Sequence, residues 1–317
     1  MSDTAQKRER LVVLLGPTAV GKTALSIQLA RALHAEILSG DSMLVYRGAD
    51  VGTAKPTVEE REGIPHHLID IRSPKENYSV QEFQQEAGRL IHALNEKRCL
   101  PLLVGGTGLY VQSLIEGYSF NASGKDEALR AKLQALAEEH GSSYLYQYLC
   151  AVDPVAAQSI HPHNLRRVIR AIEVAKIDGT TISRKRNHRL RYDVYVIGLM
   201  RPRQELYARI DARVRLMAAQ GLEDEVRRLL QSGVTTDMQM MQGIGYKEMA
   251  AYLAGEGTRE GALTDIARAT RHFAKRQMTW YRRMPYIHWY DVSGKAQEKI
   301  LEDILWNLRG FFSFEAK

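Results

Sequence analysis

The stretch Gly16-Pro17-Thr18-Ala19-Val20-Gly21-Lys22-Thr23 is a complete G-x-x-x-x-G-K-[ST] phosphate-binding loop, or P-loop, and it decides the fold. An apolar run at residues 11–15 predicts a buried strand before it, and residues 23–30 continue with helical spacing. The glycines let consecutive backbone N–H groups and the N-terminus of the helix point at a phosphate. Lys22 adds a positive charge, and the Thr23 hydroxyl is placed to touch a phosphate-bound Mg²⁺. The loop therefore predicts a site for a diphosphate or triphosphate.

The N-terminal third of the chain alternates strand and helix signals. Residues 35–39 and 100–104 have the composition of buried strands, and residues 67–70 form a shorter extended candidate. Ser79 and Glu82 make a capping box that predicts a helix running to about residue 97. This rhythm predicts an α/β fold with a doubly wound parallel sheet, which binds ligands at the carboxyl ends of its strands.

Two polar residues follow the predicted strands on the same edge as the P-loop. Asp41 comes directly after the second strand, where a carboxylate can accept a proton from a nucleophile or hold Mg²⁺ through water. The plain alternative is a helix N-cap. Thr107 follows the strand at 100–104, which ends in Gly105-Gly106 without a carboxylate. Energy-coupling ATPases place an acidic residue there, so the sequence argues against a motor or helicase and leaves small-molecule kinases and other group-transfer enzymes.

Helix signals dominate from about residue 121, and an extended segment returns at 193–199. We therefore expect a P-loop core domain made of residues 1–120 and 192–317, with a helical insertion domain at 121–191. Further helices are expected at 127–140, from Asp153-Pro154, and at 163–176, 202–221, 223–231, 257–283 and 295–308, with a last strand at 287–291.

Positive charge is concentrated in two segments of a chain whose net charge is +7. One lies in the predicted insertion: Arg166, Arg167, Arg170, Lys176, Arg184, Lys185, Arg186, Arg189 and Arg191. The other shares a predicted helix with aromatic and amide side chains: Arg268, Arg271, Lys275, Arg276, Arg282 and Arg283. Arginines bind phosphates and aromatics stack on bases, so the pattern favours RNA binding, although a solvated helix face is the alternative for either cluster.

Composition excludes several other classes of protein. The 317 residues contain no apolar run long enough to span a membrane, and residues 1–10 are polar, so we expect neither a signal peptide nor membrane contact. Cys99 and Cys150 are the only cysteines, which excludes a disulfide framework and a cysteine zinc site. Such usage suits a reducing cytoplasm.

A series of short motifs resembles one family along nearly the whole chain. They are the P-loop, Asp41-Ser42 with Tyr46-Arg47-Gly48, Gly52-Thr53-Ala54-Lys55-Pro56, Pro65-His66-His67-Leu68, Val104-Gly105-Gly106-Thr107-Gly108-Leu109-Tyr110, Asp153-Pro154 with His161-Pro162, and Ala274-Lys275-Arg276-Gln277. Each is modest, but in this order they closely resemble the bacterial tRNA dimethylallyltransferases, the tRNA isopentenyltransferase (IPP transferase) family. Val20 departs from the serine common in that family, at a variable position of the loop.

The resemblance implies a transferase that moves a dimethylallyl group from dimethylallyl diphosphate to tRNA. The acceptor is the exocyclic amine of the adenosine immediately 3′ of the anticodon, in tRNAs that read codons starting with U. By the same resemblance, residues 18–23 with Lys22 and Mg²⁺ hold the diphosphate, Asp41 is the base, Thr107 contacts the target nucleotide and Arg213 binds the diphosphate. The matching tRNA-contacting residues are Asp41, Ser42, Met43, Leu44, Thr107, Arg166, Arg167, Val168, Ile169, Arg170, Gln242, Gly243, Ile244, Gly245, Tyr246, Lys247, Lys275, Arg276 and Gln277.

The resemblance also implies that the insertion grips the anticodon stem-loop and that the target base is extruded into a channel. We expect a monomer with no metal beyond Mg²⁺. Three alternatives remain at the level of sequence: an adenylate (AMP) isopentenyltransferase, a P-loop kinase of a small metabolite, and an RNA-binding protein switched by nucleotide.

Overall fold

The computed structural model describes residues 8–118, 120, 126–179 and 190–312, and they form two compact units. The larger unit comprises Met1–Glu116 and Arg189–Lys317, and the smaller one Gly117–His188. The smaller unit overlaps the insertion that we expect at 121–191. The Arg191 N–H donates to the Ile115 carbonyl at 2.8 Å, so the chain leaves the larger unit and returns to it at neighbouring points.

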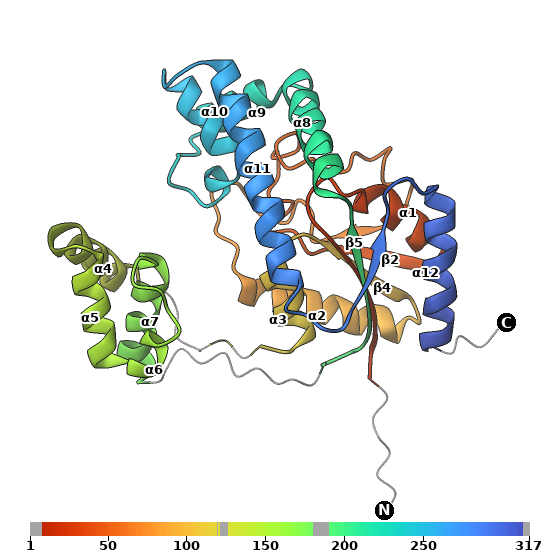
Figure 1. Ribbon diagram of the computed structural model, residues 1–317, viewed down its shortest axis with the longest axis horizontal. Coiled ribbons are helices and arrows are strands. Elements are labelled where there is room, and N and C mark those ends of the chain that lie inside the picture. The colour runs from red at the N-terminus through yellow and green to blue at the C-terminus, as the bar shows by residue number, and fades with distance from the viewer. Residues whose placement is uncertain (1–7, 119, 121–125, 180–189, 313–317) are drawn as a thin grey trace, which may run out of the picture. The chain divides into compact units, whose positions relative to one another are not determined.

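The larger unit is built on six parallel strands. They are β1 (Arg10–Leu15), β2 (Ala35–Ser39), β3 (His66–His67), β4 (Leu100–Gly105), β5 (Asp193–Met200) and β6 (Ile287–Asp291), in the order β3-β2-β4-β1-β5-β6. Strand β1 therefore lies in the interior of the sheet, between β4 and β5. Figure 1 shows the sheet with the helices of this unit around it. This confirms the predicted doubly wound parallel sheet.

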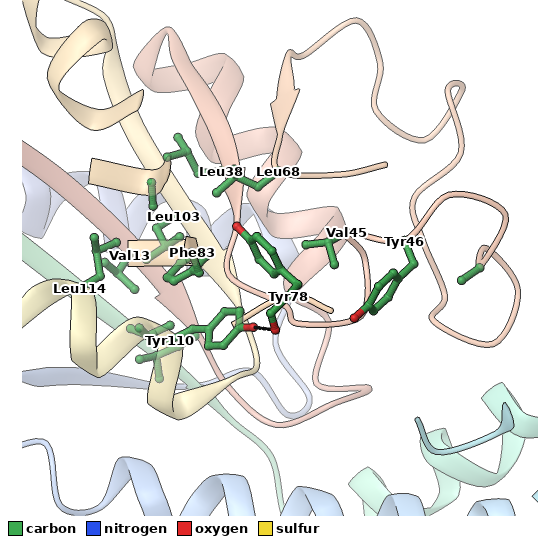
Figure 2. Packing of buried hydrophobic residues seen from close by; sticks show 14 of the residues in the cluster. Val13, Leu38, Val45, Tyr46, Leu68, Tyr78, Phe83, Leu103, Tyr110 and Leu114 are labelled. Atoms are coloured by element: carbon green, nitrogen blue, oxygen red, sulfur yellow. Dashed lines mark hydrogen bonds between the residues drawn. The ribbon is translucent and has the colours of Figure 1, made fainter. Parts of the chain in front are cut away.

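Helices cover both faces of the sheet, because successive strand residues point to opposite sides. Leu11, Val13 and Leu15 of β1 pack in a cluster with α2 (Val80–Glu96) and α3 (Gly108–Ile115). Val12 and Leu14 pack on the other face with α1 (Lys22–Leu33) and α12 (Gln297–Phe312). Figure 2 shows the first cluster, in which the Tyr110 hydroxyl donates to the Tyr78 carbonyl.

The remaining helices of this unit follow β5. They are α8 (Arg203–Ala219), α9 (Leu222–Gln231), the short 3₁₀ turn Met240–Gln242, α10 (Tyr246–Leu253) and α11 (Arg259–Tyr281). The Ser79–Glu82 capping box at the start of α2 is confirmed. The extended segment expected at 67–70 is wrong beyond His67, because Leu68 and Asp70 have positive φ angles and the strand ends there.

The smaller unit is a group of helices with its own apolar core. It contains α4 (Glu127–His140), α5 (Ser142–Val152), α6 (Pro154–Ala157) and α7 (Leu165–Asp178), which pack around Leu133, Leu145, Leu149, Val168 and Ile172. Glu173 is fully buried in it and binds Arg130 and Arg170. Burial pushes the pKa of Glu173 up, but the hydrogen bonds from the two arginines bring it below its ordinary value.

No helix in the described ranges is long and apolar enough to cross a membrane.

We predict that Leu103→Ala destabilises the larger unit by about 2–5 kcal/mol, because Leu103 is fully buried in β4 and its removal leaves a cavity. All three tryptophans, Trp280, Trp289 and Trp306, belong to this unit, so urea unfolding followed by tryptophan fluorescence reports on it alone. Leu216→Ala is the matched control, because Leu216 is 56% exposed and its loss should change the free energy of unfolding by less than about 0.5 kcal/mol. Equal effects of the two substitutions would contradict the packing described here.

Candidate active site

The P-loop joins the end of β1 to the start of α1, as the sequence predicts. Gly21 precedes the helix with φ 113°, a conformation that a side chain would strain. The Lys22 Nζ donates to the carbonyls of Gly16 and Pro17, both at 3.0 Å, so the ammonium is held over the loop. The loop can therefore present its amides and one ammonium to a single anion.

Two arginines hold the P-loop from outside. The Arg209 Nε donates to the Ala19 carbonyl at 2.8 Å, and the Arg201 Nε donates to the Val20 carbonyl at 3.0 Å. Arg201 follows β5 and Arg209 lies on α8, so both are distant from the loop in sequence. The two hydrogen bonds fix the backbone of the loop at Ala19 and Val20. Sequence reasoning missed this role, and only the clustering of arginines after a strand end could have suggested it.

Asp41 and Thr107 come together where β2 and β4 end. The Gly40 N–H, just past β2, donates at 2.7 Å to the carbonyl of Val104 near the end of β4, which joins the two chain segments. The Thr107 hydroxyl accepts from the Ser42 N–H at 3.1 Å, and the Asp41 Oδ1 accepts from the Met43 N–H at 2.9 Å. No helix begins at Asp41, so this carboxylate is not a helix N-cap.

A glutamine connects the P-loop to the Gly105-Gly106 turn. The Gln277 Oε1 accepts from the Thr18 N–H at 2.9 Å, and its Nε2 donates to the Gly106 carbonyl at 2.8 Å. Tyr281, one turn along α11, donates to the same carbonyl at 2.8 Å. Burial raises the pKa of the Tyr281 hydroxyl, and the charge of Asp41 raises it further, so Tyr281 remains a neutral donor.

The charges at this edge of the sheet influence one another. The pKa of Lys22 falls from 10.5 to about 8, chiefly because of burial and also because of the charge of Arg213, while the charge of Asp41 opposes both. Burial also lowers the pKa of Arg213, and Arg209 adds to the effect. Arg213 makes no salt bridge with any described residue. Two cations with one nearby carboxylate leave a positive site, which suits a diphosphate.

No cluster of three or more metal-ligating side chains occurs among the described residues. Thr23 offers one hydroxyl oxygen in the exposed first turn of α1, beside the loop. Mg²⁺ usually takes one or two protein oxygens together with substrate phosphates and water. The residues present therefore fit a magnesium ion that arrives with a diphosphate.

The residues predicted to contact tRNA divide into exposed and buried groups. Arg166, Arg167, Gln242, Lys247, Lys275 and Arg276 are exposed, whereas Ser42, Met43, Leu44, Thr107, Arg170, Gly243 and Ile244 are partly exposed. Val168, Ile169, Gly245, Tyr246 and Gln277 are buried. Arg184, Lys185, Arg186 and Arg189 lie outside the described residues.

The buried members have structural partners within the protein, and their expected contact with tRNA stays a prediction. Val168 and Ile169 belong to the apolar core of the smaller unit. The Tyr246 hydroxyl donates to the Glu225 carboxylate at 2.7 Å, and the same carboxylate accepts from the N–H groups of residues 50, 51 and 52. Tyr246 therefore shapes the loop before Gly52-Thr53-Ala54-Lys55-Pro56 from inside the protein.

Comparison with known proteins shows to which family the chain belongs. Residues 44–284 match the family model described as IPP transferase. The chain belongs to the IPP transferase family. It is 50% identical to the tRNA dimethylallyltransferase of Carboxydothermus hydrogenoformans over 94% of this chain and 96% of that protein. The enzyme of the same name from Bacillus cytotoxicus is 48% identical over 94% and 96% of the two chains.

Solved structures of IPP transferases have the same fold. The full-length tRNA isopentenylpyrophosphate transferase from Bacillus halodurans is 44% identical and superimposes with a TM-score of 0.74, covering 96% of this chain and 97% of that one. A eukaryotic dimethylallyltransferase, studied acting on tRNA, is 28% identical with a TM-score of 0.77, over 94% and 80% of the two chains. These likenesses confirm the family that the motifs indicate.

We predict that this IPP transferase binds an organic diphosphate more weakly as the pH rises from 7 to 9. With a pKa of about 8, Lys22 is about nine-tenths protonated at pH 7 and about one-tenth at pH 9. A bound diphosphate favours the charged ammonium, so binding takes up a proton, and affinity is lost as the pH passes through the pKa of the free protein. The expected loss is about tenfold by calorimetry. In Lys22→Arg the charge is fixed, so the affinity should no longer vary with pH; a flat wild-type profile would contradict the prediction.

Proposed function

We propose that the protein transfers a dimethylallyl group from dimethylallyl diphosphate to the exocyclic amine of the adenosine immediately 3′ of the anticodon, in tRNAs that read codons starting with U. The observation that carries the proposal is the meeting of the P-loop, Asp41 and Thr107 at one edge of the sheet, in a member of the IPP transferase family. We also propose that it acts as a monomer in the cytoplasm.

Asp41 is the proposed base. The nitrogen of the acceptor amine attacks the allylic carbon of the donor, the bond from that carbon to the diphosphate oxygen breaks, and the amine proton passes to the Asp41 carboxylate. An exocyclic adenine amine is a weak nucleophile, so positioning and proton removal must supply much of the rate. Because Oδ1 of Asp41 already accepts from the Met43 N–H, the carboxylate is oriented and Oδ2 remains for the amine.

The P-loop and its cations stabilise the leaving diphosphate. Gly16, Pro17, Thr18, Ala19, Val20 and Gly21 supply the loop, Lys22 and Arg213 supply positive charge, and Thr23 is the proposed contact for Mg²⁺. Mg²⁺ would neutralise charge on the diphosphate oxygens. Charge that develops on the leaving oxygen is then met by fixed donors in a partly buried site.

The anticodon stem-loop is the proposed partner of the exposed arginines and lysines. On α7 these are Arg166 and Arg167, and on α11 Lys275 and Arg276. Arg170 is a poorer candidate because it pairs with buried Glu173 at 2.5 Å, so its loss would leave that carboxylate with one arginine fewer.

A single set of incubations separates this function from its alternatives. The protein is given dimethylallyl diphosphate or ATP, together with unmodified tRNA, AMP or a small metabolite, and products are followed by mass. Prenylated tRNA supports the proposal. Prenylated AMP would indicate the adenylate isopentenyltransferase, and ATP consumption without prenyl transfer would indicate a kinase or a nucleotide switch.

We predict that Asp41→Asn lowers kcat by about 10²-fold or more, because the amide cannot take the proton. The Asn side-chain oxygen can still accept from the Met43 N–H, so tRNA affinity should stay nearly unchanged. Asp41→Ala removes both functions and should be at least as slow. Single-turnover prenylation and filter binding measure the two quantities, and an unchanged rate would remove Asp41 as the base.

We predict that Arg166→Ala with Arg167→Ala weakens tRNA binding and lowers the slope of log Kd against log salt by about one to two, because phosphate contacts release counterions. Donor affinity should not change. The control is Arg31→Ala with Arg309→Ala, two exposed arginines on α1 and α12 outside the proposed interface. If the double variant altered only donor affinity, the smaller unit would not be the RNA-binding part.

A further inference from the structure

Gln277 differs from its neighbours on α11. Lys275 and Arg276 are exposed, whereas Gln277 is only 5% exposed. Its amide oxygen and its amide nitrogen each bind a backbone partner, on separate loops: the Thr18 N–H and the Gly106 carbonyl. A side chain that is buried and has both ends of its amide bound inside the protein is poorly placed to contact RNA, although it lies in a stretch that resembles tRNA-contacting sequence.

The two partners of Gln277 belong to the two halves of the proposed site. Thr18 lies in the P-loop, which binds the diphosphate. Gly106 precedes Thr107, whose hydroxyl binds the Ser42 N–H beside Asp41. One amide group, with its oxygen on one half and its nitrogen on the other, therefore sets the separation between the donor phosphates and the acceptor.

The surroundings leave this amide little freedom. A Cβ placed on Gly106 would lie 2.6 Å from the Gln277 Nε2 and 3.8 Å from the Asp41 Oδ2, so only glycine permits the approach. Tyr281 holds the Gly106 carbonyl from the same helix. The contact is therefore a close three-way packing of α11, the P-loop and the turn after β4.

We infer that Gln277 is a positioning residue that fixes the distance between the diphosphate and the Asp41–Thr107 side of the site, and that it makes no contact with tRNA. This rests on the proposed function, because the two halves are defined by its two substrates. A displacement of about 1 Å between reacting groups can cost about 10²-fold in rate, while each substrate alone still finds its own half intact.

Gln277→Met tests the inference, because methionine has similar length and helix propensity but cannot form either hydrogen bond. We expect kcat for prenyl transfer at saturating substrates to fall about 10- to 100-fold. The Kd values for tRNA and for inorganic diphosphate, each measured alone, should change less than about threefold. Hydrogen exchange should rise in both loops, residues 16–21 and 105–108, because they lose the same tether.

Two other outcomes would overturn the inference. A tenfold weaker tRNA affinity with kcat unchanged at saturating tRNA would make Gln277 an RNA contact. A lower unfolding temperature with unchanged kcat and unchanged exchange in the two loops would make it a packing residue only. The tRNA affinity and the exchange do not require turnover, so they decide the matter even if the wild-type protein transfers no prenyl group, a result that would instead refute the proposed function.

Asn95→Ala is the matched control. The Asn95 side chain also joins two elements through hydrogen bonds to backbone, accepting from the Arg10 N–H at 2.9 Å and donating to the Arg10 carbonyl at 3.1 Å. It does so at the start of β1, the end of the strand opposite the P-loop. Asn95→Ala should lower the free energy of unfolding, but it should neither lower kcat nor raise the hydrogen exchange of residues 16–21.

Discussion

The parallel pairing of β1 with β4, and of β4 with β2, is the constraint on which the site depends. Leu15 pairs with Gly105, and Ser39 pairs with Val104, so the three strands end at the same level of the sheet. A slip of one residue in either register would turn the buried side chains to the wrong face and separate the loops that follow. The packing on both faces of the sheet therefore aligns the P-loop with Asp41 and Thr107, although these last two side chains lie outside the packed core.

Positive charge near the P-loop is partly neutralised by the protein and partly left for a ligand. Arg201 pairs with Glu205, and Arg271 pairs with Asp211 at 2.5 Å. Lys22 and Arg213 have no such carboxylate partner among the described residues, and each has its pKa lowered by burial. The folded protein thus holds two cations in an environment that disfavours their charge. An anion bound between them relieves that cost, which is a physical reason for selective binding of a diphosphate.

Local features of the fold follow from the sequence, and features made by distant residues do not. The P-loop, the Ser79–Glu82 capping box and the β-α alternation each depend on residues a few positions apart, and each is confirmed. The contact of Gln277 with Thr18 spans 259 positions, and that of Arg209 with Ala19 spans 190. No local pattern encodes such pairs. Helix α3 was not expected because it begins at Gly108, beside a glycine-rich turn that conceals its start.

Burial is the other property that the motif resemblance cannot supply. A stretch that matches a family motif contains both exposed and buried residues of the same helix. Arg167 is exposed next to buried Val168, and Arg276 is exposed next to buried Gln277. Only the packing shows which side chain faces solvent. The consequence is that a motif indicates a part of the surface, whereas the structure shows which of its side chains are exposed there.

The hydrogen bond between the Arg191 N–H and the Ile115 carbonyl bears on which changes in the inserted segment the sheet can tolerate. The path from α3 to β5 is closed at its base, because Ile115 and Arg191 both belong to the larger unit and bind each other there. The helices between these two points form their own apolar core. Changes in the length or the core of this segment can therefore be accommodated without altering the sheet.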